Sequence, residues 1–419
     1  MSEERFPEGP IGSLIASQTG GGTPARQNPT YWTGPIPWAS VKDFAEGQIV
    51  LQSTQEQISI QGLQASASNL IPANTPIVCT RMAVGRSAVA PMDVAINQDL
   101  KALFPARGVV TSYLLRLADY AKPKAEAVSV GSTVKGIKVA DYLSIEVPLA
   151  PTTHQSKIAE ILDTLDAAIQ GTEAVVAKLK AMKQGLLHDL LTRGIDANGD
   201  LRPPQPEAPH LYKQTPLGWL PKEWDVGKVS DQFDIQLGKM LDTQKNRGAT
   251  KTYLGNKAIQ WDKIDLTEAQ TVRMSLSDLV KFRLQPGDLL LCEGGEVGRC
   301  AIWSGELEEC YYQKALHRLR PTRGYSSRLL VELMRWYVEG DLLNEYVSKT
   351  SIAHLTQEKL ATVPLLIPPI DEQKQIEDQI IRVRDRIQSE ERLLGKFSLQ
   401  KSGLMDDLLT GRVPVTPLL

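Results

Sequence analysis

Two stretches of this sequence repeat one another and decide the fold: QSKIAEILDTLDAAIQGTEAVVAKLKAMKQGLLHDLLT at 155–192 and QKQIEDQIIRVRDRIQSEERLLGKFSLQKSGLMDDLLT at 373–410. They align without a gap at an offset of 218, and 13 of the 38 aligned positions are identical. About two or three identities are expected by chance at ordinary composition. An internal duplication is the economical explanation.

Each repeat has the periodicity of one long helix. In the first, apolar residues such as Ile158, Ile161, Leu162 and Leu165 recur every three or four positions, and the second repeats this pattern. Neither repeat contains proline, and each follows a proline-rich entry, VPLAPTTHQ or LLIPPIDEQ. At 1.5 Å per residue each helix is roughly 57 Å long. Length and duplication favour an antiparallel coiled coil over two unrelated core helices.

The segments before the two helices also repeat, more faintly. Three pairs of short words match: IVCTRMAVGR (77–86) with LLCEGGEVGR (290–299), KAL (101–103) with KAL (314–316), and IPW (36–38) with IQW (259–261). Short β-branched runs between glycine and proline turns indicate globules of the α+β class. The sequence therefore predicts two similar globules and two long helices, related by a pseudo-twofold internal repeat.

The pattern sets five segments along the chain. We expect a first globule at 1–150, a central helix at 151–193, a linker at 194–216, a second globule at 217–366 and a C-terminal helix at 367–412. The linker is assigned because this part of the chain is rich in proline, glycine and charge and has no apolar period.

Composition narrows the class of protein. The chain has 419 residues and a net charge of -2, and no apolar run approaches the roughly 20 residues of a membrane span. The start, MSEERFPEGP, does not have the pattern of a signal peptide, so we expect a cytoplasmic location. Four cysteines without zinc spacing predict reduced, buried thiols and no metal site.

One tetrapeptide suggests catalysis. Asn28-Pro29-Thr30-Tyr31 is close to the Asn-Pro-Pro-Tyr motif with which amino-methylating DNA methyltransferases hold a flipped adenine. Such an enzyme also needs a glycine-rich turn that opens a helix over S-adenosylmethionine. Here Gly20-Gly21-Gly22 is followed at once by Thr23-Pro24, which is a poor start for that helix.

Other catalytic patterns are missing too. The sequence contains no phosphate-binding loop, zinc-protease helix or nucleophile elbow. Asp288 and Glu293 only loosely approximate a nuclease carboxylate pair, because no lysine follows at the expected spacing. We expect no catalytic residues in this chain.

The layout and its words together resemble the DNA-specificity subunit of Type I restriction-modification systems. The resemblance spans essentially the whole chain and rests on GGTP, YWTGPIPW, the two VGR turns, the proline entry to each helix, the GLLHDLLTRG and GLMDDLLTGR endings, and GWLPKEW. The second globule departs from the pattern with LGKMLDT in place of the glycine run, and the first helix has His154 where the family often has an acidic residue.

The resemblance implies a DNA-binding subunit that is not itself an enzyme. Two target-recognition domains would each read half of a bipartite asymmetric site, and the helices would act as spacers that dock two modification (methyltransferase) subunits. Restriction (endonuclease and translocase) subunits would join the assembly. S-adenosylmethionine, ATP and Mg²⁺ would be held by these partners and none of them by this chain, and no contact with a membrane is expected.

Basic and tryptophan residues are the candidates for DNA contact. Five Lys or Arg occur against one Asp between Lys239 and Lys257, and six against one Glu between Lys314 and Arg335. The candidates are Arg26, Trp38, Lys42, Arg81 and Arg86 in the first globule, and Lys239, Lys245, Arg247, Lys251, Trp261, Arg299, Lys314, Arg318 and Arg320 in the second. For each of them the competing interpretation is a solvated cation or a core tryptophan.

Apolar residues near the two LLT endings are candidates for partner contact: Leu187, Leu191, Met405 and Leu409. Internal core of the coiled coil is the competing interpretation. Two rival functions also stay open, a solo adenine DNA methyltransferase and a coiled-coil scaffold without a role on DNA. Binding of S-adenosylmethionine by the isolated chain would favour the first, and absence of sequence-selective DNA binding would favour the second.

Overall fold

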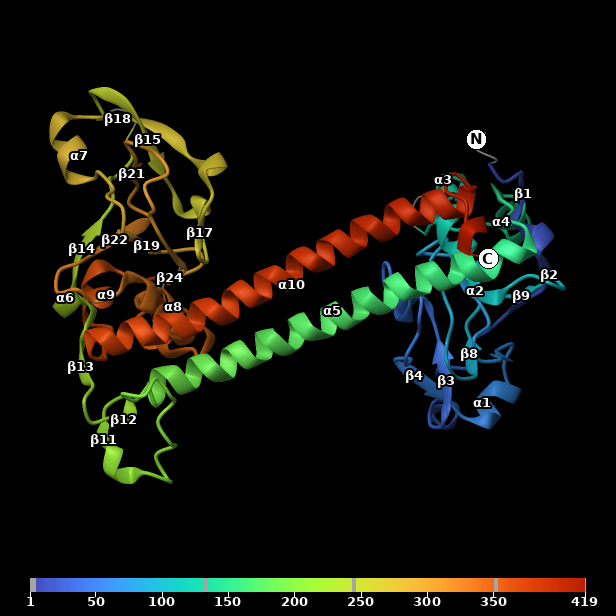
Figure 1. Cartoon of the computed structure of the whole chain (residues 1–419), viewed down its shortest axis with the longest axis horizontal. Helices are drawn as coiled ribbons and strands as arrows, with labels where there is room; N and C mark the ends of the chain where they lie inside the picture. The colour runs from blue at the N-terminus through green and yellow to red at the C-terminus, as the bar shows by residue number, and fades with distance from the viewer. Residues whose placement is uncertain (1–4, 132–133, 243–245, 350–352, 419) are drawn as a thin grey trace. The chain divides into compact units, whose positions relative to one another are not determined.

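The fold is known from a computed structural model, which describes residues 5–131, 134–242, 246–349 and 353–418. The contacts divide the chain into two units (Figure 1). The first unit is Met1–Ala174 with Glu391–Leu419, and the second unit is Val175–Glu390. Each unit combines one globule with parts of the two long helices, α5 (Thr152–Thr192) and α10 (Ile370–Thr410).

The first globule is a mixture of short strands and helices. Its strands are β1 (Glu8–Pro10), β2 (Ile15–Gly20), β3 (Ile36–Ala39), β4 (Glu56–Ile58), β5 (Asn69–Ile71), β6 (Ile77–Cys79), β7 (Ser87–Ala88), β8 (Val94–Ile96), β9 (Leu100–Pro105) and β10 (Glu146–Pro148). Its α-helices are α1 (Ile60–Gln64), α2 (Thr111–Tyr120), α3 (Lys122–Val128) and α4 (Val139–Leu143).

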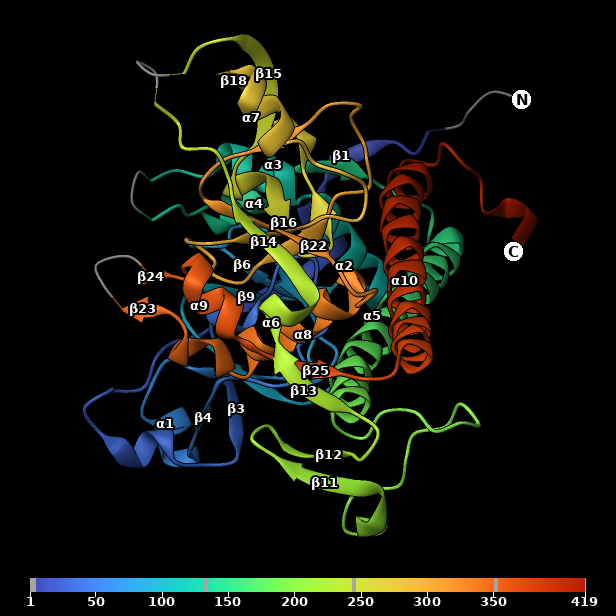
Figure 2. The ribbon, with the colours of Figure 1, turned by 90° about the vertical axis from the view of Figure 1, so that its left-hand side faces the viewer.

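The second globule has the same mixture. Its strands are β11 (Tyr212–Thr215), β12 (Gly218–Pro221), β13 (Asp225–Lys228), β14 (Phe233–Leu237), β15 (Ala249–Leu254), β16 (Ile259–Gln260), β17 (Lys263–Ile264), β18 (Gln270–Met274), β19 (Leu289–Cys292), β20 (Cys300–Ile302), β21 (Tyr311–Tyr312), β22 (Leu316–Pro321), β23 (Ser348–Lys349), β24 (Ala353–His354) and β25 (Pro364–Ile367). Its α-helices are α6 (Val229–Gln232), α7 (Leu276–Lys281), α8 (Ser327–Glu339) and α9 (Gln357–Thr362), and α6 and α9 lie beside β14 (Figure 2).

Strand pairing confirms that the globules are repeats. The first has a sheet of order β2-β9-β6-β7, and the second has β14-β22-β19-β20. A second sheet contains the parallel pair β3 and β8 in the first globule and the parallel pair β15 and β21 in the second. A third pairing joins β1 to β10 and β13 to β25, both antiparallel. The predicted α+β class and internal duplication are therefore confirmed.

Two of the predicted word matches are wrong, IPW with IQW and KAL with KAL, and the first shows where the globules diverge. The strand pairing aligns Trp38, which lies opposite Ala95, with Tyr253, which lies opposite Tyr311. The IQW word at 259–261 instead enters β16, which pairs with β17 in a hairpin of its own. The second globule therefore carries additional chain around this point, and a match of three letters was too short to reveal it.

Both long helices are present as predicted, and each packs against its globule. In the first unit, Ile158 and Leu162 of α5 share one buried cluster with Tyr113 of α2 and with Leu408 and Leu409 of α10. In the second unit, Leu187 and Leu190 of α5 share a cluster with Ile376 and Ile380 of α10 and with residues of α8. Each globule therefore completes its core with the two long helices, which pack together within each unit.

The first residue of each repeat is a buried glutamine with the same role. Gln155 accepts a hydrogen bond from Val110 N and donates one to Ala150 O, both at 3.0 Å. Gln373 accepts from Ser326 N at 3.0 Å and donates to Pro368 O at 2.8 Å. Because a buried amide is costly without partners, each glutamine fixes the start of α2 or α8 against its long helix.

The four cysteines are buried and unpaired, as the sequence predicts. Burial raises the pKa of Cys79 and of Cys310 to about 12, so both stay protonated at neutral pH. No helix among the described residues is long and apolar enough to cross a membrane.

We predict that Gly238→Ala destabilises the second unit. A Cβ at this position would lie 2.2 Å from the carbonyl oxygen of Gln313, so backbone would have to shift, at a cost of about 1–3 kcal/mol. The matched control is Gly185→Ala in α5, where nothing lies within 4 Å; it removes a flexible residue from a helix and should stabilise by about 0.5–1 kcal/mol. Denaturant unfolding of both variants tests this, and equal midpoints would contradict it.

Candidate functional site

Two of the candidate arginines form ion pairs inside the second globule. Arg318 is 4% exposed, pairs with Asp234 and donates a hydrogen bond to Gln236 at 3.2 Å. Arg320 binds the carboxylate of Asp288 through two hydrogen bonds of 2.6 and 2.7 Å. Asp288 is only 1% exposed, so Arg320 neutralises a buried charge, and the loose nuclease-like pattern around Asp288 is structural.

Two candidate lysines are also paired. Lys239 lies 2.9 Å from Asp278 at the start of α7. Burial acts to raise the pKa of Asp278, but hydrogen bonds from Lys239 and Ser275 outweigh it and leave that pKa below its usual value. Lys251 pairs with Glu309, whose hydrogen bond raises the pKa of the lysine. Both lysines hold elements of the second globule together.

The VGR words form the same turn in both globules. Cys79 N donates to Arg86 O and Cys292 N donates to Arg299 O, each at 2.8 Å. The preceding glycines have φ of +82° and +85°, a left-handed conformation that favours glycine. Arg86 then donates to Phe44 O at 2.9 Å, and Arg299 to Asn256 O at 3.1 Å. These two candidate arginines therefore fasten a hairpin turn to a neighbouring loop.

The candidate tryptophans lie in or near the core. Trp38 is 2% exposed, and its indole donates to Gly22 O at 3.1 Å and to Ser68 Oγ at 3.0 Å. Trp261 is half-buried under the guanidinium of Arg335, which lies 5.0 Å from the ring centre. Trp38 has no free face for stacking on a base, and the face of Trp261 under Arg335 is covered.

Five candidates reach solvent: Arg26, Lys42, Arg81, Arg247 and Lys314. Arg26 stacks over Trp32 at 3.7 Å and pairs with Glu56, and that pairing lowers the pKa of Glu56. Arg81 lies 3.4 Å from Asp99. Lys245 lies outside the described residues. Because they are exposed, the five solvent-accessible candidates are compatible with contact to a DNA phosphate.

The Asn28 to Tyr31 stretch forms a turn. Asn28 caps the 3-10 helix Pro29–Trp32, and its amide oxygen accepts from Thr30 N at 3.1 Å and from Thr30 Oγ1 at 2.7 Å. These bonds occupy the amide oxygen locally. The stretch also stands outside any doubly wound parallel sheet, which an S-adenosylmethionine site of this kind requires.

Two grooves on the second globule gather polar side chains, of which only Lys314 was a candidate from the sequence. One, of about 480 Å³, is lined by Lys281 and Lys314 together with Gln236 and Gln357. The other, of about 650 Å³, is lined by Asn246, Arg273 and Thr271, among others. Met240 lines the first groove and Leu241 the second, so the grooves adjoin along this segment. Lys, Arg, Asn and Gln are the side chains that contact base edges and phosphates.

The KAL words do not occupy matching positions of the two sheets. Leu100 lies opposite Cys79 and Leu316 lies opposite the matching Cys292, so Lys101 corresponds to His317 and Lys314 corresponds to Gln98. The ammonium of Lys101 lies beside Gly20. A Cβ on Gly21 would lie 1.8 Å from Ile96 O. The glycines therefore allow two backbone segments to pack closely, and Lys101 lies beside Gly20. The predicted match of the KAL words is therefore wrong, because three letters were too short to identify corresponding lysines.

Three of the four candidate partner contacts are core residues. Leu187 and Leu191 are 4% and 1% exposed in the second unit, and Leu409 is 0% exposed in the first. Met405 is partly buried against the same cluster as Leu409. The large apolar residues that reach solvent on the long helices are different ones: Val175, Met182, Ile370, Leu393 and Leu399. Periodicity alone could not separate the two sets, because both lie on apolar stripes.

Among the described residues, no group of three or more His, Cys, Asp or Glu could hold a metal ion. The two grooves of the second globule are lined by cations and amides, and also by Asp234 and Asp242.

We predict that Arg320→Met lowers the free energy of unfolding of the second unit by about 3 kcal/mol, because it leaves the Asp288 carboxylate buried without its partner. Lys314→Ala, on an exposed residue of the same strand region, should change it by less than about 0.5 kcal/mol. Arg320→Met combined with Asp288→Asn should recover part of the loss. Denaturant unfolding measures all three, and equal stability of the two single variants would contradict the structural role of Arg320.

Comparison with known proteins matches this architecture. A family model described as the Type I restriction modification DNA specificity domain matches residues 6–181 and again residues 221–396. The specificity subunit of the Type I restriction enzyme MjaIX from Methanocaldococcus jannaschii is 26% identical over 231 residues, which are 54% of this chain and 51% of the relative. The EcoR124I/EcoR124II specificity subunit from Escherichia coli is 30% identical over 162 residues, 36% of this chain and 39% of the relative. The chain thus spans about half, or less, of the length of these curated relatives.

A solved structure shares the fold. The S subunit of a Type I restriction-modification system from M. genitalium superposes with a TM-score of 0.59 at 12% identity, covering 96% of each chain. The family model matches most of the chain in two copies, one for each globule with part of its helix. The chain therefore belongs to the Type I restriction modification DNA specificity family.

Proposed function

We propose that this chain is the DNA-recognition subunit of a Type I restriction-modification complex and reads a bipartite, asymmetric target. The observation that carries the proposal is the double match to the specificity-domain family, with one match on each of two globules that share a topology. The globules differ in sequence, so their half-sites should differ. Half-site centres about one turn of DNA apart would suit two readers on one face of the duplex.

Within the second globule, the adjoining grooves are the proposed DNA surface. Lys281 and Lys314 would contact phosphates, while Gln236, Asn246 and Arg273 have the amides and guanidinium that read base edges. In the first globule, the exposed Arg26 and Lys42 and the partly exposed Lys101 would supply the cations. The near-neutral net charge of -2 means that attraction to DNA has to come from such local groups.

The chemistry is proposed to belong to partner subunits in the cytoplasm. Two modification subunits would bring S-adenosylmethionine and flip an adenine in each half-site, and restriction subunits would bring ATP and Mg²⁺. The chain itself would hold no cofactor and catalyse no step. Its own contribution would be to choose the sequence and to hold two methyltransferases at a fixed separation.

The test is to sequence methylated adenines in a methylation-free host that expresses this chain with its modification subunit. A split asymmetric motif should appear with the chain and disappear in a control without it. Lys281→Ala combined with Lys314→Ala should leave the motif unchanged and lower the fraction of sites methylated, because phosphate contacts add affinity without sequence information. Methylation without the chain would favour an enzyme among the partners that needs no specificity subunit. No motif under any condition would favour the scaffold.

We further propose that the modification subunits dock on the exposed apolar residues of the long helices. Val175 and Leu393 occupy matching positions of the two repeats and are 42% and 38% exposed, and Met182 and Leu399 are 57% and 77% exposed. Solvent-exposed apolar residues on a helix favour burial against a partner helix.

Met182→Glu and Leu399→Glu should each reduce capture of the modification subunit at least tenfold, while the unfolding midpoint stays within about 2 °C because both side chains are exposed. The neighbouring exposed Gln184→Glu and Gln400→Glu introduce the same charge and are the matched controls. Capture by affinity pull-down measures the effect. Unchanged capture by both Met182→Glu and Leu399→Glu would place the docking surface elsewhere.

A further inference from the structure

Matching positions of α2 and α8 carry buried charges of opposite sign. The two helices have the same place in the repeated topology, directly after β9 and β22. Aligned from their first residues, TSYLLRLADY and SRLLVELMRW place Arg116 opposite Glu332 and Asp119 opposite Arg335. Arg116 is 1% exposed and Glu332 is 2% exposed. Both therefore need a partner within the fold.

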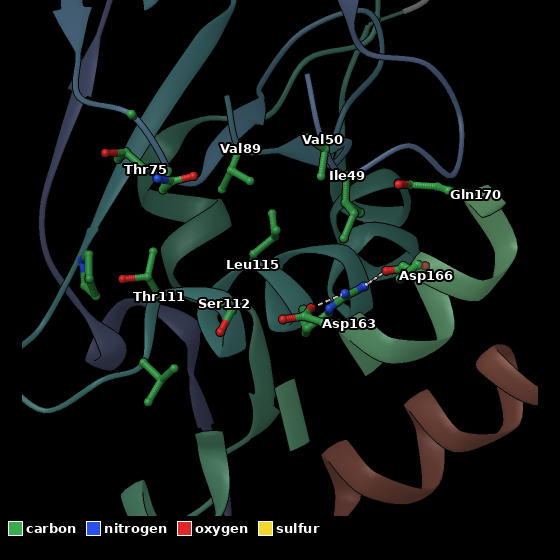
Figure 3. Close-up of a pocket in the computed structure, with 16 residues that line it drawn as sticks. Ile49, Val50, Thr75, Val89, Thr111, Ser112, Leu115, Asp163, Asp166 and Gln170 are labelled. Carbon is green, nitrogen blue, oxygen red and sulfur yellow. Dashed lines mark hydrogen bonds and ion pairs between the residues drawn. The ribbon is translucent and has the colours of Figure 1, made fainter. Parts of the chain in front are cut away.

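In the first unit the partners are acidic and lie on α5. Arg116 pairs with both Asp163 and Asp166 (Figure 3). Asp166 also lies 2.7 Å from the ammonium of Lys401 on α10. Arg116 lines a cavity of about 750 Å³. Its guanidinium is already paired with the two aspartates, which line the same cavity. Arg116 therefore binds the globule to α5. An anion in the cavity would gain little from Arg116, because the two aspartates already neutralise the positive charge of the guanidinium.

In the second unit the partners are basic. Glu332 lies 3.7 Å from Lys183 of α5 and 3.9 Å from Arg335. Arg335 pairs in turn with Asp262, which Arg384 of α10 approaches to 4.0 Å. Glu332 and Arg384 line the same small cavity, together with Ile381.

We call the contact between a globule and its long helices a junction. The offset of 218 between the long helices allows the two junctions to be compared position by position. It aligns Asp163 with Ile381, Asp166 with Arg384, and Lys183 with Lys401. The lysine is thus common to both junctions, whereas the charges on the globule and on the helix directly after it are reversed. The apolar contacts and the glutamines at 155 and 373 are of the same kind in both junctions and offer no such distinction.

We propose that this reversed polarity assigns each globule to its own long helix. The first globule on the start of α10 would place Arg116 beside Arg384 and Lys183, at a cavity whose acid from α10 is Glu377, one helical turn before Ile381. The second globule on the start of α5 would place Glu332 against Asp163 and Asp166. A buried charge that faces its own sign is strongly unfavourable. The same rule excludes docking of a globule on the wrong helix of another copy of the chain, so the order of the two half-site readers is fixed.

Grafting one junction onto the other tests the proposal in the full-length chain, with thermal unfolding of the first unit as the readout. Arg116→Glu should lower Tm by roughly 10 °C, and Asp163→Ile with Asp166→Arg should lower it similarly. The triple variant recreates the arrangement of Glu332, Ile381 and Arg384, with Lys401 already in place. It should regain at least half of the larger loss.

Controls separate polarity from loss of packing. Arg107→Glu makes the same charge change on an exposed residue and should shift Tm by less than about 2 °C. Arg116→Met removes the pair without adding a like charge and should cost less than Arg116→Glu. If Arg116→Glu, or Asp163→Ile with Asp166→Arg, fails to fold, a triple variant that still unfolds cooperatively shows the expected rescue. Additive losses, a regain below half, or an unchanged Tm for Arg116→Glu would overturn the proposal, and none of these outcomes depends on DNA recognition.

Discussion

The arrangement depends on one constraint: neither globule closes its core without the long helices. Ile158 and Leu162 of α5 are fully buried in the same cluster as Tyr113 of α2, and Ile376 of α10 is buried with α8 in the second unit. An apolar stripe shared in this way cannot slide along the globule without exposing both surfaces. Each globule is therefore held rigidly on its helices, as a reader of spaced half-sites requires.

A second feature is that the core of each globule is divided into separate clusters. In the second, the helix-facing cluster contains Leu329 and Leu333, while a separate cluster contains Tyr253, Phe282 and Tyr312. The grooves with Lys281, Lys314 and Arg273 are lined by members of this outer cluster, Phe282 and Tyr253. A substitution at Phe282 or Tyr253 would therefore reshape a groove through the outer cluster, which is separate from the cluster that contains the long helices. Such a division lets the recognised sequence change while the assembly stays the same.

The sequence was sufficient for the helices and the repeat because both are local or periodic patterns. It was insufficient for the site because charges pair over long distances in the chain. Arg318 pairs with Asp234, 84 residues away, and Arg116 pairs with Asp163, 47 residues away. Nothing in a basic run separates such a buried arginine from an exposed one like Arg247. The same holds for Leu191 and Met182, which follow one helical pattern but differ in exposure.

Comparing the chain with itself partly resolves this ambiguity. If the two globules read different half-sites, residues that determine specificity have to differ between the copies, while residues common to both serve the shared fold or the shared phosphate backbone. Arg86 and Arg299 are common, and both fasten the same turn. Lys101 and Lys314 are not common, because strand pairing matches Lys101 with His317. Gln236, Asn246 and Arg273 line the two grooves. Gln236 corresponds by strand pairing to Thr19 of the first globule, so it differs between the copies, as base readout requires.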